Sequence, residues 1–247
     1  MNLSNHRYLI NLKHYLLRGF FCIPLMITLI SYIRFVYFFY FKKNFKSFYS
    51  MENDVIKRNT RYTKINIFNL IKIYNYFSYK KKILRFLPLK ALNFLKPVNM
   101  KVLTIGPRDE SELFGLVALG FQLKNISGLD VQSYSNLITL GDAIDIPFEK
   151  DSFDLVIIGK MLVYTEKPDK VINETIRVLK DGGVVSMFHT HIRDDYYTDF
   201  KFDSSKFFLD FFDKNLDDIY FRYHTFDKDT KSKRGISNIV ISIKKMM

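Results

Sequence analysis

Cysteine and tryptophan are almost absent from this 247-residue sequence. Cys22 is the only cysteine, which excludes an internal disulfide bond, and no cluster of cysteine and histidine indicates a structural metal. Tryptophan is missing while phenylalanine and tyrosine are plentiful, a bias that we interpret as compositional. The chain is nevertheless long enough for a sizeable core, either as one large domain or as one domain with an appendage.

Acidic residues are scarce in the first hundred positions. Residues 1–100 contain 18 Lys and Arg but only Glu52 and Asp54, a net charge of +16, whereas residues 101–247 contain 20 basic and 23 acidic residues, a net charge of −3. This asymmetry indicates a boundary near Pro97–Met100 and an anionic partner for the first part alone. We therefore predict three parts: a hydrophobic and basic segment (1–50), a basic helical lead-in (51–98) and a globular domain (99–247).

The N-terminal segment lacks an uncharged run long enough to cross a bilayer. Gly19 to Ile33 carries no charge, but a span needs about 20 apolar residues. Extending the run to Phe41 includes Arg34, which costs roughly 2.5–3.5 kcal/mol on insertion scales. No small-residue cleavage site typical of a signal peptide follows. Three interpretations stay open: a helix lying in the membrane interface, a poor spanning anchor, and a helix packed on the domain or on a second subunit, with membrane contact slightly preferred.

The lead-in mixes aromatic and aliphatic residues with many lysines and arginines between Tyr62 and Leu95. A polybasic surface beside apolar helix residues attracts anionic lipid, which is our first interpretation. A solvated helix face comes second. Nucleic-acid binding through the interleaved aromatics comes third, because no RNA-binding motif is present.

Short apolar runs alternate with helical patterns after residue 100. The expected strands are Lys101–Gly106, Ile126–Asp130, Asp154–Ile158 and Val184–Phe188, and the expected helices are Arg108–Leu119, Asp169–Lys180 and Lys206–Phe212. Two terminal strands, Asp218–Thr225 and Ser237–Ile243, would form a hairpin around a turn at Lys228–Gly235. Strand, helix and strand in this order give right-handed parallel crossovers, so we predict an α/β fold whose ligands bind at the carboxyl ends of the strands.

Two acids are expected at that edge of the sheet. Asp130 ends the second strand, 24 residues after Gly106. This spacing suits a carboxylate that accepts a hydrogen bond from a ribose hydroxyl, although an acid at a strand-end turn is a serious alternative. Asp142 precedes the loop that ends at Pro147-Phe148, and its carboxylate could also accept hydrogen bonds from a ligand.

Four sequence patterns occur in order and at near-constant spacing: Gly141-Asp142-Ala143, Ile146-Pro147-Phe148, Asp151–Asp154 and Arg177–Gly183. Together they resemble class I S-adenosylmethionine-dependent methyltransferases, in the branch that acts on small molecules and quinones. Looser similarity extends from about Lys101 to the C-terminus. The resemblance implies S-adenosyl-L-methionine as cofactor. It also implies a Rossmann-like seven-stranded methyltransferase sheet with a terminal antiparallel hairpin, preceded here by the basic helical N-terminal region.

The resemblance further implies which residues contact the cofactor. Asp130 would hold the ribose, and Asp142 would hold the adenine amino group. Further contacts would come from Gly106 at the methionine moiety, Ala143 and Ile144 against the adenine ring, and Gly159 and Tyr164 facing the cofactor and the acceptor.

The first loop departs from the family pattern of an acid followed by three spaced glycines. Thr104 replaces the acid, Gly106 is kept, and Arg108 and Glu110 occupy the later glycine positions. Two outcomes follow. Arg108 could pair with the cofactor carboxylate, or Arg108 and Glu110 could fill the pocket and leave a fold that no longer binds the cofactor. A dinucleotide site is not favoured, because Gly-x-Gly-x-x-Gly is absent.

Two histidines, His189 and His191, lie at the carboxyl end of the last crossover strand. A histidine at that position could act as a general base for a hydroxyl acceptor, so His189 and Tyr164 are the candidates for catalytic roles. A metal site would need a third ligand, and none is evident, so we predict no metal. Polar residues at the edge of a sheet are the preferred interpretation of both histidines.

We therefore expect a methyltransferase that acts on a small-molecule, lipid or glycan acceptor in the cytoplasm, held near a membrane by its first hundred residues. One alternative is an inactive relative that keeps the fold as a binding or scaffold protein. Another is an RNA methyltransferase that uses the basic part, although nucleic acid is not favoured. The acceptor and the oligomeric state have no signature in this sequence.

Overall fold

The computed structural model describes residues 16, 19–20, 24–48, 86–92, 95–159, 161–162, 165, 167–192, 205–226 and 234–245. Most of the predicted lead-in, from 51 to 85, lies outside the described residues, as does most of the predicted turn at Lys228–Gly235.

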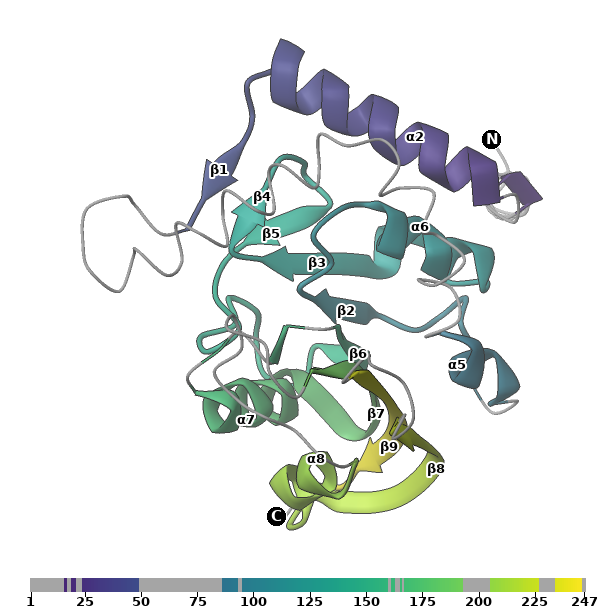
Figure 1. The fold of residues 1–247 in the computed structure, drawn as a ribbon, viewed down its shortest axis with the longest axis vertical. Helices are drawn as coiled ribbons and strands as arrows, with labels where there is room; N and C mark the ends of the chain where they lie inside the picture. The colour runs from purple at the N-terminus through teal and green to yellow at the C-terminus, as the bar shows by residue number, and fades with distance from the viewer. Residues whose placement is uncertain are drawn as a thin grey trace, which may run out of the picture.

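The described residues form a seven-stranded sheet with the order β5-β3-β2-β6-β7-β9-β8 (Figure 1). The strands are β2 (Val102–Ile105), β3 (Ile126–Asp130), β5 (Ile138–Leu140), β6 (Phe153–Ile158), β7 (Leu179–Ile192), β8 (Leu216–Phe226) and β9 (Arg234–Ile243). The ladders from β5 to β7 are parallel, and β9 runs antiparallel to both of its neighbours. The predicted α/β sheet with a terminal hairpin is confirmed.

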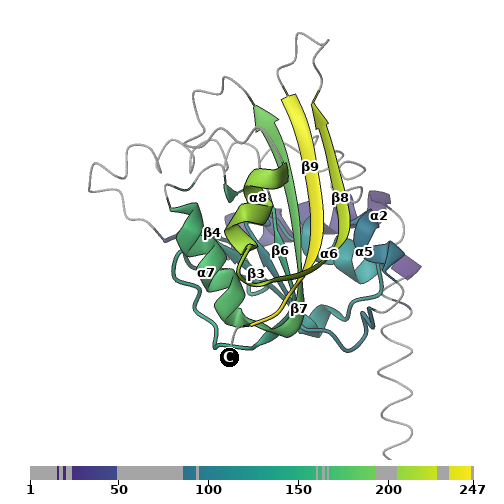
Figure 2. The ribbon, with the colours of Figure 1, turned by 90° about the horizontal axis from the view of Figure 1, so that it is seen from below.

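Helices cover both faces of this sheet. One face packs against α7 (Pro168–Val178) and α8 (Ser205–Phe212), and the other packs against α6 (Ser111–Ala118), α5 (Leu87–Ala91) and α2 (Pro24–Val36) (Figure 2). All four side chains of the inner strand β2 are buried. A strand that is buried on both faces reads as a continuous apolar run, which explains why no alternation marks the parallel strands in the sequence.

Two helices differ from their predicted bounds for local reasons. Helix α6 begins at Ser111 and not at Arg108, because Arg108 has φ +55°, a left-handed conformation that cannot start a right-handed helix. Helix α7 ends at Val178, because Leu179 already pairs with Phe153 at the start of β7. The strand β7 is correspondingly longer than the predicted Val184–Phe188.

The N-terminal segment runs across the domain. Helix α2 continues into a π-helical turn, η1 (Tyr37–Phe41), and then into β1 (Lys46–Ser47), which pairs antiparallel with β4 (Gln132–Ser133). One face of α2 is buried on the domain, so the interpretation of a helix packed on the domain is confirmed for α2. Among the described residues, no helix has the length and apolarity needed to cross a bilayer.

Candidate functional site

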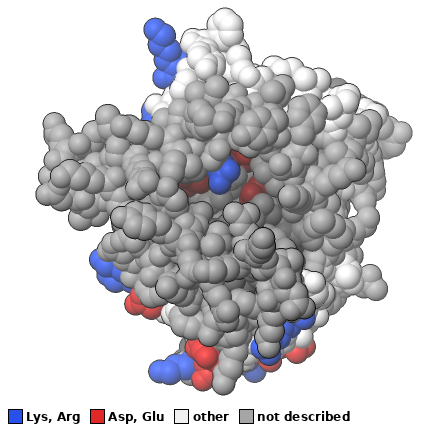
Figure 3. Space-filling view, in the orientation of Figure 1, with Lys and Arg blue, Asp and Glu red and all other residues white. Residues whose placement is uncertain are grey.

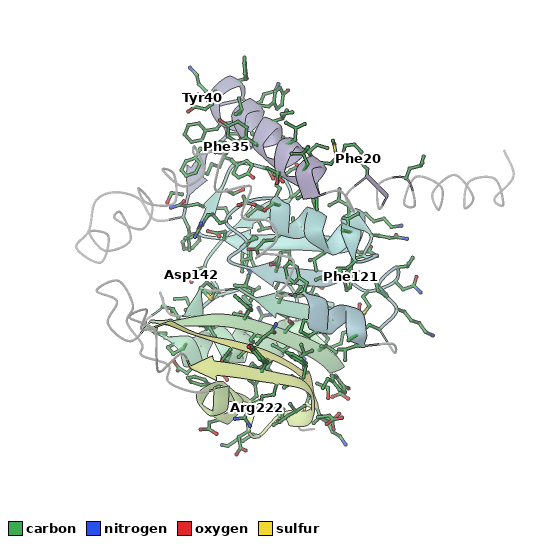
Figure 4. All side chains as sticks on the ribbon, turned by 45° about the vertical axis from the view of Figure 1, so that its right-hand side comes forward. Phe20, Phe35, Tyr40, Phe121, Asp142 and Arg222 are labelled. Carbon is green, nitrogen blue, oxygen red and sulfur yellow. The ribbon has the colours of Figure 1, made fainter. Side chains whose placement is uncertain are left out.

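The structure brings the two predicted acids to one edge of the sheet. Asp130 is the last residue of β3, and Asp142 follows the end of the neighbouring strand β5 by two residues. Asp130 stands opposite Leu140 in the parallel ladder, and the Gly141 amide donates to the Asp130 carbonyl oxygen at 3.0 Å. Asp142 lies at the edge reached by the carboxyl ends of the parallel strands (Figure 4).

Asp130 is held by backbone donors from two loops. Its Oδ2 accepts from the amide of Arg108 at 3.1 Å, and its Oδ1 accepts from the amide of Gln132 at 3.1 Å. Burial of the carboxyl group nevertheless raises the pKa of Asp130 to about 6, because desolvation outweighs these two hydrogen bonds and the nearby positive charge of Arg108. Hydroxyl groups donating to this carboxylate would stabilise its charged form, as the hydroxyls of a ribose would.

Asp142 organises the loop that follows β5. Its Oδ1 accepts from the amide of Ile144 at 3.1 Å, which turns the chain so that Ala143 is buried and Ile144 is half-buried against the core. The loop thus presents apolar surface next to a carboxylate. This combination suits a flat heteroaromatic ring that carries an amino group.

Helix α7 fixes the far end of the same loop. The Arg177 guanidinium donates to the carbonyl oxygens of Ile146 at 2.7 Å and of Phe148 at 2.8 Å, and it also pairs with Glu174. Glu174 in turn accepts from the amide of Ile146 at 2.8 Å. From the sequence, Arg177 was only part of a family pattern, and Glu174 was not predicted. The one available signal was that the Ile146–Phe148 and Arg177–Gly183 patterns occur together.

Gly106 is closely covered by the chain itself. Its φ of +73° is a conformation that side-chain-bearing residues rarely adopt, and an added Cβ would stand 2.8 Å from the Met161 Cβ. Gly159 lies beside it, where an added Cβ would approach the carbonyl oxygens of Ile105 and Gly106 at 3.4 and 3.5 Å. Both glycines therefore allow the segment after β6 to approach the loop after β2.

Arg108 and Glu110, which occupy the second and third glycine positions of the family pattern, lie in two different environments. Arg108 is exposed, so its side chain is not packed into the interior of the domain. Glu110 is fully buried and pairs with Arg34 of α2, at 2.5 Å for Nε–Oε2 and 2.8 Å for Nη2–Oε1. Thr104, which replaces the family's acid, is fully buried within β2. In the space-filling view, basic and acidic atoms are visible side by side near the middle of the molecule (Figure 3).

A second set of contacts joins α2 to the same loop. The Glu110 amide donates to the hydroxyl oxygen of Tyr134 at 3.1 Å, and the ring of Tyr134 stacks edge-on against Phe35 of α2 with a centroid distance of 5.3 Å. The pairing of the Lys46–Ser47 strand with β4 continues this contact beyond Asp130. The N-terminal segment thus contacts both the loop after β2 and the loop after β3.

Of the two catalytic candidates, the structure describes only the backbone of His189. Tyr164 lies outside the described residues. The backbone of His189 pairs with Ser237 and that of His191 pairs with Gly235, so both histidines lie at the carboxyl end of β7 as predicted. The strand extends to Ile192 because β9 supplies a long antiparallel partner. Within the described part of the chain, no group of three or more candidate ligands could hold a metal ion.

The described residues suit the nucleoside part of S-adenosylmethionine. Asp130 is half-buried and its pKa is raised, so ribose hydroxyls that donate to its carboxylate would stabilise the charged form. Asp142, Ala143 and Ile144 form the neighbouring polar and apolar surface. Where the methionine part of the cofactor would lie, Met161 covers Gly106. The exposed Arg108 belongs to the same loop after β2.

Comparison with protein families finds one match in this region. Residues 122–187, from the turn that follows α6 into β7, match the family described as methyltransferase domain. The matched region contains Asp130, Asp142 and Arg177, and it begins after the altered loop. A search of curated proteins finds no significant match.

Solved structures with the same fold include the Haloferax volcanii complex of the Trm112 methyltransferase activator with a protein described as a methyltransferase. It is 15% identical, with 68% of this chain and 92% of that chain covered and a TM-score of 0.50. The PH0226 protein of Pyrococcus horikoshii OT3 is 20% identical, with 67% and 91% of the two chains covered and a TM-score of 0.48. At an identity of 15%, the likeness to the Haloferax volcanii structure shows the fold alone.

Proposed function

We propose that this chain, which carries a class I S-adenosylmethionine-dependent methyltransferase domain, transfers a methyl group to a small-molecule, lipid or glycan acceptor. The observation that supports donor binding is the pair of carboxylates on neighbouring strand ends, Asp130 and Asp142, beside the apolar surface of Ala143 and Ile144. The proposal for the acceptor rests on the resemblance to the small-molecule and quinone branch.

The protein contributes mainly position to such a reaction. When bound, S-adenosylmethionine supplies a methyl group that is already activated by a sulfonium, which becomes a neutral thioether after transfer. Asp130 would accept from the ribose hydroxyls and Asp142 from the adenine amino group, which fixes the donor in one orientation. Loops anchored by Arg177 and by Glu110 hold these groups in place before the ligand arrives.

Calorimetry with the full-length protein tests donor binding. We expect micromolar affinity for S-adenosylmethionine and measurable affinity for adenosine, because the described contacts serve the nucleoside part. Asp130→Ala and Asp142→Ala should each weaken binding at least about tenfold through the loss of hydrogen bonds to a charged group. Asp210→Ala on the exposed face of α8 is the matched control and should bind normally. Equal affinities for all four proteins would contradict the proposed site.

A second candidate function is a binding or scaffold protein that no longer uses the donor. The close cover of Gly106 by Met161 favours it, because the family places the methionine moiety beside this glycine. This candidate predicts no heat of binding at millimolar S-adenosylmethionine. Adenosine binding without S-adenosylmethionine binding would show that the nucleoside site is kept while the methionine site is closed.

A further inference from the structure

Helix α2 has two apolar faces, and only one of them contacts the domain. Ile27, Ser31 and Phe35 are fully buried and lie four residues apart on the inner face. Leu25, Leu29 and Ile33 are also four residues apart, but they are displaced by two positions from the buried set. At about 100° per residue, that displacement places the two sets on opposite sides of the helix.

The outward set continues past the end of α2. Leu25, Leu29, Ile33, Tyr37 and Phe41 are 54%, 44%, 54%, 46% and 76% exposed, and we call these five residues the outer stripe. The π-helical turn over Tyr37–Phe41 winds more slowly than an α-helix, which keeps Phe41 near the line of the preceding residues. A continuous apolar stripe of this length on an exposed helix indicates an interaction surface.

The charges around the outer stripe are of one sign. Lys42, Lys43 and Lys46 directly follow it and are exposed, with the Lys42 ammonium 5.8 Å from the centroid of the Tyr37 ring. Residues 1–51 contain no aspartate or glutamate. In the space-filling view, the upper edge where Figure 1 shows α2 is mostly uncharged, and basic atoms stand at one end of it (Figure 3).

Arg34, the charge that interrupts the apolar run in the sequence, is not part of this surface. It turns to the inner side and pairs with the buried Glu110. The outer stripe is therefore uncharged along its whole length, and the cations gather at its C-terminal end. Apolar side chains with lysines beside them are typical of a helix that lies in the interface of an anionic membrane.

We propose that the outer stripe, together with Lys42, Lys43 and Lys46, docks the protein onto an anionic membrane surface with α2 lying in the plane of the interface. The apolar residues enter the headgroup and acyl boundary, and the lysines contact anionic headgroups. A second copy of the chain is the competing occupant, but it would bring the same three cations and no acid from this segment to neutralise them. The proposal does not depend on methyl transfer.

Cosedimentation of the full-length protein with lipid vesicles tests this proposal. The vesicles contain phosphatidylcholine and phosphatidylserine in a ratio of about 7:3, and pure phosphatidylcholine vesicles serve for comparison. We expect Leu29→Gln with Ile33→Gln to lower vesicle partition at least about tenfold. The matched control, Ile219→Gln with Tyr223→Gln on β8, alters residues of similar exposure (40% and 51%) at the opposite end of the sheet and should change partition less than about twofold.

A lysine variant separates charge from apolar contact. Lys42→Gln, Lys43→Gln and Lys46→Gln together should lower partition onto phosphatidylserine vesicles about tenfold or more and leave partition onto pure phosphatidylcholine unchanged. Circular dichroism should show native helix content in every variant, because all the substituted side chains are exposed. Absence of wild-type binding, or wild-type partition by the Leu29 and Ile33 variant, would overturn the proposal. So would a lipid-free dimer that this variant dissociates, since the stripe would then bind a second copy.

Discussion

Replacement of Arg34 by methionine should destabilise the protein through Glu110. Methionine keeps much of the aliphatic length of the arginine side chain and removes its charge, so the fully buried Glu110 carboxylate loses both of its bonds to the guanidinium. Removing one partner of a buried pair costs roughly 3–5 kcal/mol. The Arg34 side chain is 34% exposed. Water therefore already solvates part of the pair, and we expect the low end of this range, about 3 kcal/mol.

This loss is large enough to measure by urea unfolding of the full-length chain, followed by far-ultraviolet circular dichroism. For a chain of 247 residues, it corresponds to a fall in melting temperature of about 6–12 °C. Arg34→Lys should be intermediate, because an ammonium cannot form the two parallel hydrogen bonds that a guanidinium forms. Arg34→Met with Glu110→Gln should recover most of the loss, because a neutral amide costs less to bury than a carboxylate.

The matched control is the exposed pair of Lys180 and Asp154, whose Nζ–Oδ1 distance is 2.7 Å. Lys180→Met should cost less than about 1 kcal/mol, because both partners are accessible to water. If Arg34→Met were no more destabilising than Lys180→Met, or if the double variant were no more stable than Arg34→Met, the buried pair would not hold α2 as described. Arg34→Met should also weaken donor binding more than Lys180→Met does, because Glu110 belongs to the loop after β2.

Four further predictions concern the donor site and the loops around it. The pKa of Asp130 is raised to about 6 by burial, so S-adenosylmethionine affinity measured by calorimetry should be level above that pH and fall up to about tenfold per pH unit below it. Stability of the free protein in urea should show the opposite contribution, decreasing as pH rises from the ordinary carboxyl pKa of 3.8 to about 6, because the folded state holds this proton more tightly. Gly106→Ala should lower the free energy of unfolding in urea by at least about 1–2 kcal/mol, because φ is +73° and the new Cβ would stand 2.8 Å from the Met161 Cβ. Adding Met161→Gly to Gly106→Ala should relieve this contact but not the backbone strain. Arg177→Met should lower the free energy of unfolding by about 1–3 kcal/mol and weaken donor binding, because the carbonyl oxygen of Ile146 loses its hydrogen-bond donor. Unchanged donor affinity in calorimetry would show that the loop after β5 does not contribute to the donor site.

Six of the seven strands were predictable from the sequence, because the inner parallel strands are short apolar runs between helical patterns; the three-residue edge strand β5 was missed. β3 was predicted to the residue, and Asp130 therefore came to the carboxyl edge as expected. The loop after β5 was predicted from linked family patterns, which also placed Asp142. These features depend on neighbours within a few positions or on patterns shared by many proteins.

The missed features depend on residues that are distant in sequence. The pair of Arg34 and Glu110 joins positions 76 residues apart, and neither residue carries a local sign of its partner. The two-residue strand of Lys46 and Ser47 is too short for any periodicity to mark it. Glu110 stands where the family has a glycine. The sequence suggested that its side chain could fill the cofactor pocket, whereas in the structure it pairs with Arg34 of α2.

That attachment has a consequence for finding related proteins. An acid in place of the third loop glycine has a counterpart in an arginine on an upstream helix, and either residue alone would be left as a buried or misplaced charge. Proteins that inherited this arrangement should keep or lose both residues together, as a covarying couple that straddles the start of the recognised domain. The couple would serve as a signature for the N-terminal helix where ordinary sequence likeness has already faded.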